Sequence, residues 1–283
     1  MPNMTKNGGA LQKVITLDAR AALREDVGDG DMSAALAGDI VSCGVLFCRQ
    51  RAVLCGAPWF EKVFLLLDSG AIFDWRTKEG EMTKGEVCTV TASAKALLSG
   101  ERAAVNFLQT LSATATAARK WQKRAQQKQP GLMITDTRKT IPKLRAAQKY
   151  AVRIGGAHNH RMGLFDEILI KENHIRAAGS IAEALRKAKK ECADSQKITT
   201  EVRDGKELQQ ALQAGAKRIL LDNFSVNQLR AAVKINRGRA QLEASGGISY
   251  AALPEIAASG VNRISAGALT KNIRAVDFSF IIK

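Results

Sequence analysis

Polar side chains end a series of short apolar runs in the second half of the chain, and they recur at a nearly constant interval. Glu201, Asp222, Glu243 and Ser265 are separated by 21, 21 and 22 residues. Each interval has room for one strand and one helix. Strands that alternate with helices over short connections run parallel and are joined by right-handed crossovers. The pattern predicts an α/β barrel or an open doubly wound sheet, and the regular interval favours the barrel.

Six apolar runs after residue 130 are predicted to be the strands of this sheet. They cover residues 132–135, 168–170, 198–200 with Val202, 218–221, 241–243 and 263–265. Helix-start signals lie between them, since the first side chain of Ser180-x-x-Glu183, Asp204-x-x-Glu207 and Ser225-x-x-Gln228 can accept from free helix amides. Six strands fall short of the eight in a complete barrel. Either the barrel is short, or the first half of the chain supplies further elements.

The first half of the chain is predicted to mix helices and strands. Helical spacing covers residues 17–23 and 59–67, and strand alternation covers 44–54 and 86–94. A long alanine-rich helix is predicted to begin near Ser99-Gly100-Glu101 and to end before Pro130. Because 283 residues exceed the ~100–200 residues of a typical domain, this helix is expected to join two halves.

The charge balance is strongly basic, with 43 Lys and Arg against 27 Asp and Glu. Such a surplus attracts anions, and nucleic acid, phosphorylated metabolites or an acidic membrane would all satisfy it. The chain has only two Tyr and three Trp and no basic block interleaved with aromatic residues, which argues against stacking on bases. A basic nucleic-acid-binding protein is kept as a rival hypothesis, which steeply salt-dependent binding would support.

The expected location is a reducing cytoplasm, without membrane association. The first ten residues lack the apolar segment of a signal peptide, and no run approaches the ~20 apolar residues of a membrane span. The five cysteines form an odd number without a C-x-x-C pair. This pattern argues against a disulfide framework and against a zinc ribbon.

Basic side chains gather after the first two predicted strands of the barrel, at the ends where barrel enzymes build their active sites. Arginine binds a carboxylate or phosphate in a bidentate way, and lysine adds a movable charge. The group therefore suits a small molecule with two or more carboxylates. It consists of Arg138, Lys139, His160, Arg161 and Lys171.

The histidines allow a second interpretation. His158 and His160 form the H-x-H pattern of barrel metallohydrolases, with His174 as the candidate third ligand. Arg161 and Lys171 would repel a divalent cation there, and the chain has only three histidines. The sequence therefore favours His160 as a tautomer-fixed donor to a substrate carboxylate, with His158 and His174 holding loops.

Carboxylates and glycine-rich loops occupy the later strand ends. Glu201 and Asp222 end successive repeats, and their hard oxygens suit Mg²⁺, which keeps several waters and is usually shared with substrate phosphates. Ser245-Gly246-Gly247 precedes a helix, and the last strand ends in Ser265 to Ala268. Glycine-rich loops on the final strands of a barrel commonly bind phosphate through backbone amides.

Seven stretches resemble, in order and over nearly the whole chain, the quinolinate phosphoribosyltransferases, also called decarboxylating nicotinate-nucleotide pyrophosphorylases. Each stretch alone is weak, and together they are highly specific. They are Glu25 to Asp31, Glu101-Arg102 with Asn106, Asp136 to Thr140, Asn159-His160-Arg161, Leu169 to Lys171 with Asn173-His174, Leu221-Asp222-Asn223, and Ser245 to Ile248.

The resemblance implies an N-terminal α/β sandwich domain over residues 1–115 and an incomplete α/β barrel of about six strands over 116–283. It leaves open a return of the extreme C-terminus to the first domain. It also implies a homodimer in which Arg102 of one chain completes the active site of the other, with higher oligomers left open.

The implied enzyme is a pentosyltransferase, a nicotinate-nucleotide diphosphorylase (carboxylating). It would join quinolinate to phosphoribosyl pyrophosphate with decarboxylation, giving nicotinate mononucleotide for NAD biosynthesis, with Mg²⁺ as cofactor. The implied catalytic residues are Lys139, Lys171, Glu201 and Asp222, and the last two also serve as metal ligands. The implied substrate-binding residues are Arg102, Thr137, Arg138, Lys139, His160, Arg161, Lys171, Ser245, Gly246, Gly247, Ala266, Gly267 and Ala268.

Four positions depart from the family pattern: Lys143 and Ala157 replace glycines, Glu172 replaces Asp, and Arg203 stands where an acid is common. Arg203 is expected to add positive charge near the metal carboxylates. A sister family associated with molybdate transport shares the fold, so action on another substrate is the alternative enzymatic function. The stretches around Asn159 and Lys171 favour the quinolinate branch.

Overall fold

The computed structural model describes residues 8–38 and 40–283. It divides into two compact units, which are described separately. The N-terminal unit contains the described part of Met1–Arg119 together with Ile141–Gly156 and Asn272–Lys283. The C-terminal unit contains Lys120–Thr140 and Ala157–Lys271.

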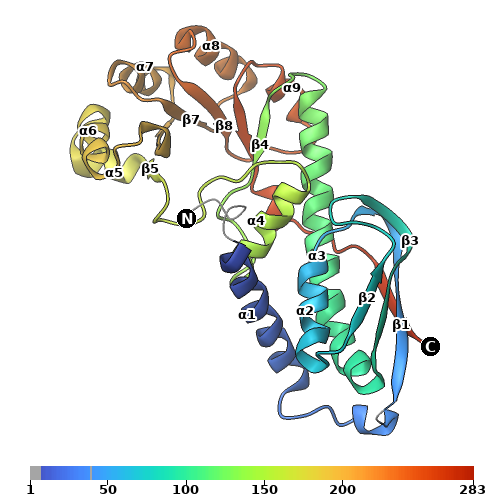
Figure 1. Ribbon diagram of the computed structural model, residues 1–283. Coiled ribbons are helices and arrows are strands. Elements are labelled where there is room, and N and C mark those ends of the chain that lie inside the picture. The colour runs from blue at the N-terminus through green and yellow to red at the C-terminus, as the bar shows by residue number, and fades with distance from the viewer. Residues whose placement is uncertain (1–7, 39) are drawn as a thin grey trace. The chain divides into compact units, whose positions relative to one another are not determined.

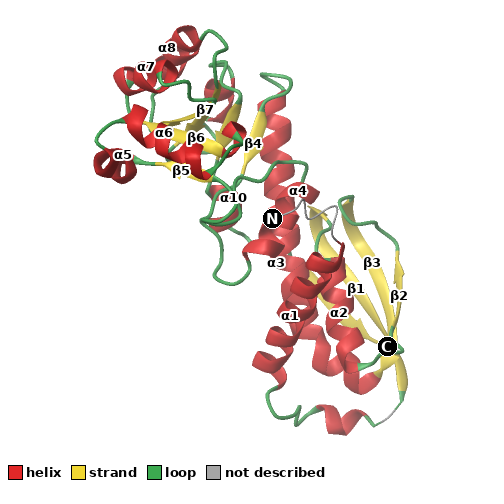
Figure 2. Ribbon diagram, turned by 60° about the vertical axis from the view of Figure 1, so that its left-hand side comes forward, coloured by secondary structure: helices red, strands yellow, loops and turns green. Residues whose placement is uncertain are grey.

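The N-terminal unit is built on an antiparallel four-stranded sheet in the order β10-β1-β3-β2. Figure 2 shows helices α1, α2 and α3 beside this sheet. The strands are β1 (Val41–Val53), β2 (Ile72–Trp75), β3 (Met82–Ser93) and β10 (Phe278–Ile282). The helices are α1 (Gly8–Val27), η1 (Ala34–Ala37), α2 (Ala57–Leu67), α4 (Arg145–Ile154) and the larger part of α3 (Ala94–Gln126).

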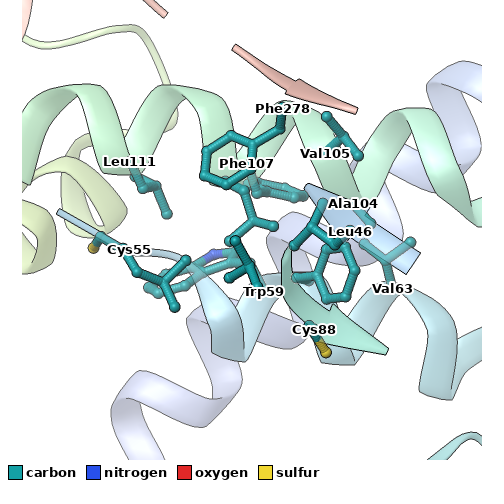
Figure 3. Close-up of a cluster of buried hydrophobic side chains, with 14 of the residues drawn as sticks. Leu46, Cys55, Trp59, Val63, Cys88, Ala104, Val105, Phe107, Leu111 and Phe278 are labelled. Carbon is teal, nitrogen blue, oxygen red and sulfur yellow. The ribbon is translucent and has the colours of Figure 1, made fainter. Parts of the chain in front are cut away.

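Helix α2 fills the centre of this unit because its apolar residues recur at helical spacing and face the sheet. Trp59, Phe60, Val63 and Phe64 are fully buried. Figure 3 shows Trp59 and Val63 among side chains from the strands and from α3, including Leu46, Cys88 and Phe107. Burial of each large apolar side chain stabilises the unit by about 1.5–3 kcal/mol.

Several predicted elements of this unit differ from the observed ones. Helix α3 begins at Ala94, five residues before the predicted start. Ser99 is therefore not a helix cap, and its hydroxyl instead donates to Asp31 Oδ2 at 2.8 Å. The sequence pattern also missed α4 and the strand β10, which pairs with β1 from the far end of the chain. Such a pairing leaves little local signal, because it depends on residues more than 200 positions apart.

The C-terminal unit contains a parallel six-stranded sheet in the order β4-β9-β8-β7-β6-β5. Its strands are β4 (Met133–Thr135), β5 (Ile168–Ile170), β6 (Ile198–Val202), β7 (Arg218–Asp222), β8 (Gln241–Ser245) and β9 (Arg263–Ser265). The six predicted strands and their parallel arrangement are confirmed. This sheet and the separate antiparallel sheet confirm the predicted class, an N-terminal α/β sandwich domain with an incomplete α/β barrel.

Helices connect the strands of this sheet, and Figure 2 shows α5 to α8 around them. They are α5 (Glu172–Ala178), α6 (Ile181–Glu191), η2 (Ser195–Lys197), α7 (Gly205–Gln213), α8 (Val226–Asn236), α9 (Leu253–Ala257) and α10 (Ala268–Lys271). The three predicted helix starts are confirmed. The side chains of Ser180, Asp204 and Ser225 accept from the backbone amides of the third helical residues of α6, α7 and α8.

Lys143 has a left-handed backbone with φ = 64°, which explains why glycine is usual at this position. A side chain in this region costs about 1–2 kcal/mol, and glycine loses about 0.5–1 kcal/mol more entropy on folding. We therefore expect Lys143→Gly to raise the free energy of unfolding by about 0.5–1 kcal/mol. Lys143→Ala should leave it unchanged, because the strain stays. Urea unfolding measures both, and equal effects of the two variants would contradict this explanation.

Candidate active site

A cavity of about 230 Å³ lies at the carboxyl ends of the strands in the C-terminal unit. Ten of the predicted site residues line it: Thr137, Arg138, Lys139, His160, Arg161, Lys171, Glu201, Asp222, Ser245 and Gly246. A larger hollow of about 330 Å³ between β5, α5 and α6 is lined mainly by Ile, Leu and Ala side chains. Charged groups converge on the first cavity, whereas the hollow is mainly apolar, so the first cavity is the candidate active site.

The cavity is also lined by Ser265, which the sequence placed at the end of the last strand, and by two residues that the sequence interpretation left out of the site, Leu169 and Leu220. Leu169 and Leu220 each lie two positions before a predicted site residue, Lys171 and Asp222. Alternate residues of a strand share a face, so period-two counting back from each site residue could have identified both. They add apolar wall to a cavity of charged groups, which suits a flat aromatic ring.

Asp136 fixes the loop that carries the central basic residues. It is fully buried directly after β4, and its Oδ1 accepts the backbone N–H of His160 at 2.9 Å. Its Oδ2 accepts from Asn159 Nδ2 at 2.6 Å. The backbone of His158 also pairs with β4 at Thr135. The 158–161 segment is therefore held beside the strand end, which brings two distant sequence motifs together.

The ring of His160 is fixed by contacts to both of its nitrogens. The backbone N–H of Arg161 donates to His160 Nδ1 at 2.8 Å, so the neutral ring carries its proton on Nε2. His160 Nε2 lies 3.5 Å from Glu243 Oε1. The Arg161 contact favours the predicted tautomer, and the Glu243 contact is electrostatic, since Glu243 Oε1 accepts no hydrogen bond from the residues that the structure describes. The Nε2 proton faces a buried carboxylate, and whether it also reaches a substrate carboxylate stays a prediction.

The other two histidines are tied to the backbone of neighbouring segments, His174 through its side chain and His158 through its own backbone. His174 Nδ1 accepts the backbone N–H of Lys171 at 3.0 Å and so supports the start of α5. Burial, and secondarily the charge of Arg263, lowers the pKa of His158. Both residues have contacts that suit loop support.

Positive charge is concentrated on one side of the cavity. Burial, followed by the positive charge of the neighbouring Arg138, lowers the pKa of Arg161. Lys171 Nζ lies 3.0 Å from Glu201 Oε2. An anionic ligand would relieve the repulsion between the two arginines, and a cation at Glu201 would compete with Lys171.

The two glycine loops pack closely against neighbouring loops of the cavity. Gly246 has φ = 97°, and a Cβ at this position would lie 2.1 Å from Asn223 Oδ1. A Cβ at Gly267 would lie 3.1 Å from the Lys139 side chain. Thr270 Oγ1 then donates to the Lys139 carbonyl at 2.7 Å. The last strand loop therefore supports the loop that follows β4.

Some predicted site residues do not line the cavity. The amide of Ala266 donates to the Thr135 carbonyl at 2.9 Å and is used within the sheet. Gly247 and Ala268 follow the lining residues along their loops, Ala268 as the first residue of α10. Arg102 belongs to the N-terminal unit, where its side chain is 61% exposed.

Arg203 does not add free positive charge at the cavity, contrary to expectation. Its guanidinium lies 2.7 Å from Glu207 Oε1 and 3.0 Å from Glu172 Oε1. Two of the departures from the family pattern, Glu172 and Arg203, are thus ion-pair partners.

Glu201 and Asp222 provide the carboxylates that could hold Mg²⁺. They lie on the adjacent strands β6 and β7, and both line the cavity. The described residues contain no group of three or more His, Cys, Asp and Glu arranged around a metal. Two carboxylates fit Mg²⁺, because this ion is usually bound by one or two of them together with waters and substrate phosphates. The donor set suits a metal that arrives with a phosphorylated substrate.

Family models match almost the whole chain. The model described as quinolinate phosphoribosyl transferase, N-terminal domain, matches residues 32–112, and the C-terminal domain model matches residues 114–281. A probable nicotinate-nucleotide pyrophosphorylase [carboxylating] of Bacillus subtilis is 40% identical over 258 residues, covering 90% of this chain and 89% of that protein.

Solved structures and plant relatives extend this similarity. The nicotinate-nucleotide pyrophosphorylase of Francisella tularensis has a TM-score of 0.91 and 42% identity, covering 96% of this chain and 97% of that one. A quinolinate phosphoribosyltransferase [decarboxylating] of Nicotiana tabacum is 33% identical over 284 residues, covering 92% of this chain and 80% of that protein. The similarity therefore includes both units.

Proposed function

The chain belongs to the quinolinate phosphoribosyltransferase family, and from this premise we propose how the cavity of its C-terminal unit performs the family reaction. The enzyme transfers the phosphoribosyl group of phosphoribosyl pyrophosphate to quinolinate with decarboxylation. The products are nicotinate mononucleotide, pyrophosphate and carbon dioxide, so the enzyme acts in NAD biosynthesis.

One observation carries the assignment of the reaction to this cavity: cations and carboxylates from separate strands converge on it. Arg138, Lys139, Arg161 and Lys171 supply positive charge, while Glu201 and Asp222 supply negative charge. A doubly negative pyridine matches the first group. A metal-bound pyrophosphate matches the second, so the two substrates can lie side by side with their reacting atoms in contact.

The basic side chains bind and orient quinolinate. The guanidinium groups of Arg138 and Arg161 can each bind a carboxylate in a bidentate way, and Lys171 supplies a movable positive charge. Leu169 and Leu220 give the ring an apolar wall. Held in this way, the ring nitrogen attacks the anomeric carbon of the ribose, a C–N bond forms, and the C–O bond to pyrophosphate breaks.

Glu201 and Asp222 would hold Mg²⁺, and the loops at Ser245 and Gly267 lie where the phosphates would bind. The chemistry that Mg²⁺ supplies when bound is neutralisation of negative charge on pyrophosphate. Lys139 adds a further cation, and its position is supported by Gly267 and Thr270. The protein itself mainly positions the two substrates and neutralises their charge.

Decarboxylation follows from the new positive charge on the pyridine nitrogen. The bond from ring carbon 2 to its carboxylate breaks, and the electron pair stays on the ring beside the quaternised nitrogen. A proton from solvent then replaces the carbon dioxide. The neighbouring cations stabilise the charge that develops in this step.

The experiment that tests the function is incubation of the purified protein with quinolinate, phosphoribosyl pyrophosphate and Mg²⁺. Chromatography should show nicotinate mononucleotide, with one carbon dioxide released per molecule. Omission of Mg²⁺ or replacement of quinolinate by nicotinate should reduce the product strongly. Absence of product under all conditions would contradict the proposed function and would favour the molybdate-associated alternative.

The proposed working form is a homodimer in which Arg102 of each chain serves the cavity of the other. Support comes from the family resemblance and from the position of Arg102 on α3, where its side chain is largely exposed. Within residues 8–38 and 40–283, its side chain contacts one charged partner, the adjacent Glu101, at 3.3 Å. An arginine in this situation remains available for a carboxylate from outside its own unit.

Mixing Arg102→Ala with Lys171→Ala protein is expected to restore activity. In a two-fold dimer with random pairing, about one quarter of the sites receive neither substitution. A mixture of Lys139→Ala and Lys171→Ala provides the matched control, because these residues serve the same cavity of one chain and no intact site can form. Equal activity of the two mixtures after subunit exchange would rule out the shared site.

A cytoplasmic location is proposed on the basis of the cysteines. Cys43, Cys48, Cys55, Cys88 and Cys192 all have free thiols. Free thiols are the rule in reducing compartments. Among the helices of residues 8–38 and 40–283, none has the length and apolar character needed to cross a membrane.

A further inference from the structure

A charged residue lies beneath the floor of the cavity, where the interior of a barrel is normally filled by branched apolar side chains. Glu243 on β8 is only 3% exposed. A buried carboxylate costs several kcal/mol of desolvation unless partners offset it. None of the steps described above uses this residue, so its presence requires another explanation.

Strand register sets the depth of Glu243. Asp222 pairs with Ser245, and both line the cavity. Glu243 is two residues before Ser245 and therefore lies on the same face one layer deeper, level with Leu220 and Arg263. Figure 1 shows β8 beside β7 within this sheet.

The two carboxylate oxygens of Glu243 face different partners. Oε2 lies 3.5 Å from Arg263 Nε, within the same layer. Oε1 lies 3.5 Å from His160 Nε2, in the floor of the cavity. Burial raises the pKa of Glu243, and the charge of Arg263 opposes that shift. One side of the residue thus belongs to the barrel interior and the other to the active site.

His160 links Glu243 to the backbone of the 158–161 segment, which carries Arg161. Its backbone N–H donates to Asp136, and its Nδ1 accepts from the backbone of Arg161. The orientation of the ring therefore determines the direction in which the Arg161 backbone leaves the loop. Because Nδ1 is an acceptor, Nε2 carries the proton. Nε2 lies 3.5 Å from Glu243 Oε1, which accepts no hydrogen bond within the described part of the chain, so the carboxylate acts on the ring through its charge. A carboxylate at that point favours this tautomer and this ring orientation.

We propose that Glu243 is a positioning residue for the pyridine-binding side of the site, acting through the ring of His160 on the placement of Arg161. This inference rests on the proposed function and adds a residue to it. It follows that loss of the carboxylate should weaken the binding of quinolinate and should leave the binding of phosphoribosyl pyrophosphate nearly unchanged. A residue that only stabilised the barrel would not separate the two substrates.

The first test is the steady-state kinetics of Glu243→Gln, which keeps the shape of the side chain and removes its charge. We expect KM for quinolinate to rise at least about tenfold, by analogy with the loss seen when a carboxylate that orients a metal-binding histidine is removed. KM for phosphoribosyl pyrophosphate should change less than about twofold, a difference below 0.5 kcal/mol. Glu255→Gln, an exposed acid on α9, is the matched control and should leave both constants unchanged.

The second test is a spectrum of the imidazole nitrogens in protein labelled with ¹⁵N-histidine, which contains only three such rings. In the native protein His160 should show the Nε2–H tautomer. In Glu243→Gln its nitrogen signals should shift, while those of His158 and His174 stay in place. This readout does not depend on turnover.

The outcomes separate the two proposals. A native protein that forms no nicotinate mononucleotide contradicts the proposed function, whatever the histidine spectrum shows. If the native enzyme is active and Glu243→Gln changes neither KM for quinolinate nor the His160 signals, the proposed role of Glu243 is wrong. If Glu243→Gln does not fold, the native spectrum still decides, because an Nδ1–H tautomer of His160 would overturn the proposal.

Discussion

Replacing Lys171 by alanine is expected to lower kcat/KM for quinolinate by about 100- to 1,000-fold, the usual effect of removing one preorganised donor from an active site. Lys171 is the movable cation of the cavity, and its Nζ lies 3.0 Å from Glu201 Oε2. The substitution removes positive charge from the pyridine side. It also leaves the Glu201 carboxylate, which is 15% exposed, without its lysine. Nicotinate mononucleotide formation at saturating phosphoribosyl pyrophosphate measures the effect.

The fold should tolerate this substitution, because the Lys171 side chain is half exposed and makes a single salt bridge. The free energy of unfolding should change by less than about 1 kcal/mol. Lys190→Ala, on the exposed face of α6, is the matched control and should retain native kinetics. A folded Lys171→Ala enzyme with native kcat/KM would show that the cavity binds quinolinate without this cation.

The barrel could be predicted from the sequence because its signals are local. Each strand is a short apolar run, and Ser180, Asp204 and Ser225 mark helix starts through contacts three residues away. The basic loop and the carboxylates were predictable for the same reason. Lys139 and Lys171 follow β4 and β5, and Glu201 and Asp222 lie at the ends of β6 and β7. Their convergence at one edge is therefore a consequence of parallel topology.

The depth of each residue within the barrel could not be predicted, because it depends on the register between strands. The interval of 21 residues suggested that Glu243 ends its strand as Asp222 does. The observed pairing places Ser245 opposite Asp222 and puts Glu243 opposite Leu220. A shift of two residues converts a candidate rim carboxylate into a buried group beneath His160.

The N-terminal unit was harder to predict because distant segments complete it. Helix α4 belongs to this unit although it lies between β4 and β5 in the sequence. Strand β10 pairs with β1 across more than 200 residues. The periodic pattern of neither element distinguishes it from an element of the barrel. The departures Glu172 and Arg203 similarly became interpretable only when the structure showed them as partners.

Gly155 is the point at which α4 packs against α3 in the N-terminal unit. Its φ of −66° is accessible to any residue, so backbone conformation does not require glycine here. Space does. A Cβ would lie 2.4 Å from the Ala115 carbonyl oxygen and 2.6 Å from Ala118 Cβ. Arg119 Nε also donates to the Gly155 carbonyl at 2.8 Å, which ties the two helices together at this contact.

Gly155→Ala is therefore expected to lower the free energy of unfolding by about 3 kcal/mol, the upper end of the usual cost of overpacking, since backbone atoms must move. For a chain of this size the melting temperature should fall by about 6–12 °C. The matched control is Gly205→Ala, because a Cβ at the start of α7 meets no atom within 4 Å. This change should stabilise the protein by about 0.5–1 kcal/mol through the unfolded state. If calorimetry shows both variants melting with the native protein, the close contact between α3 and α4 does not exist in solution.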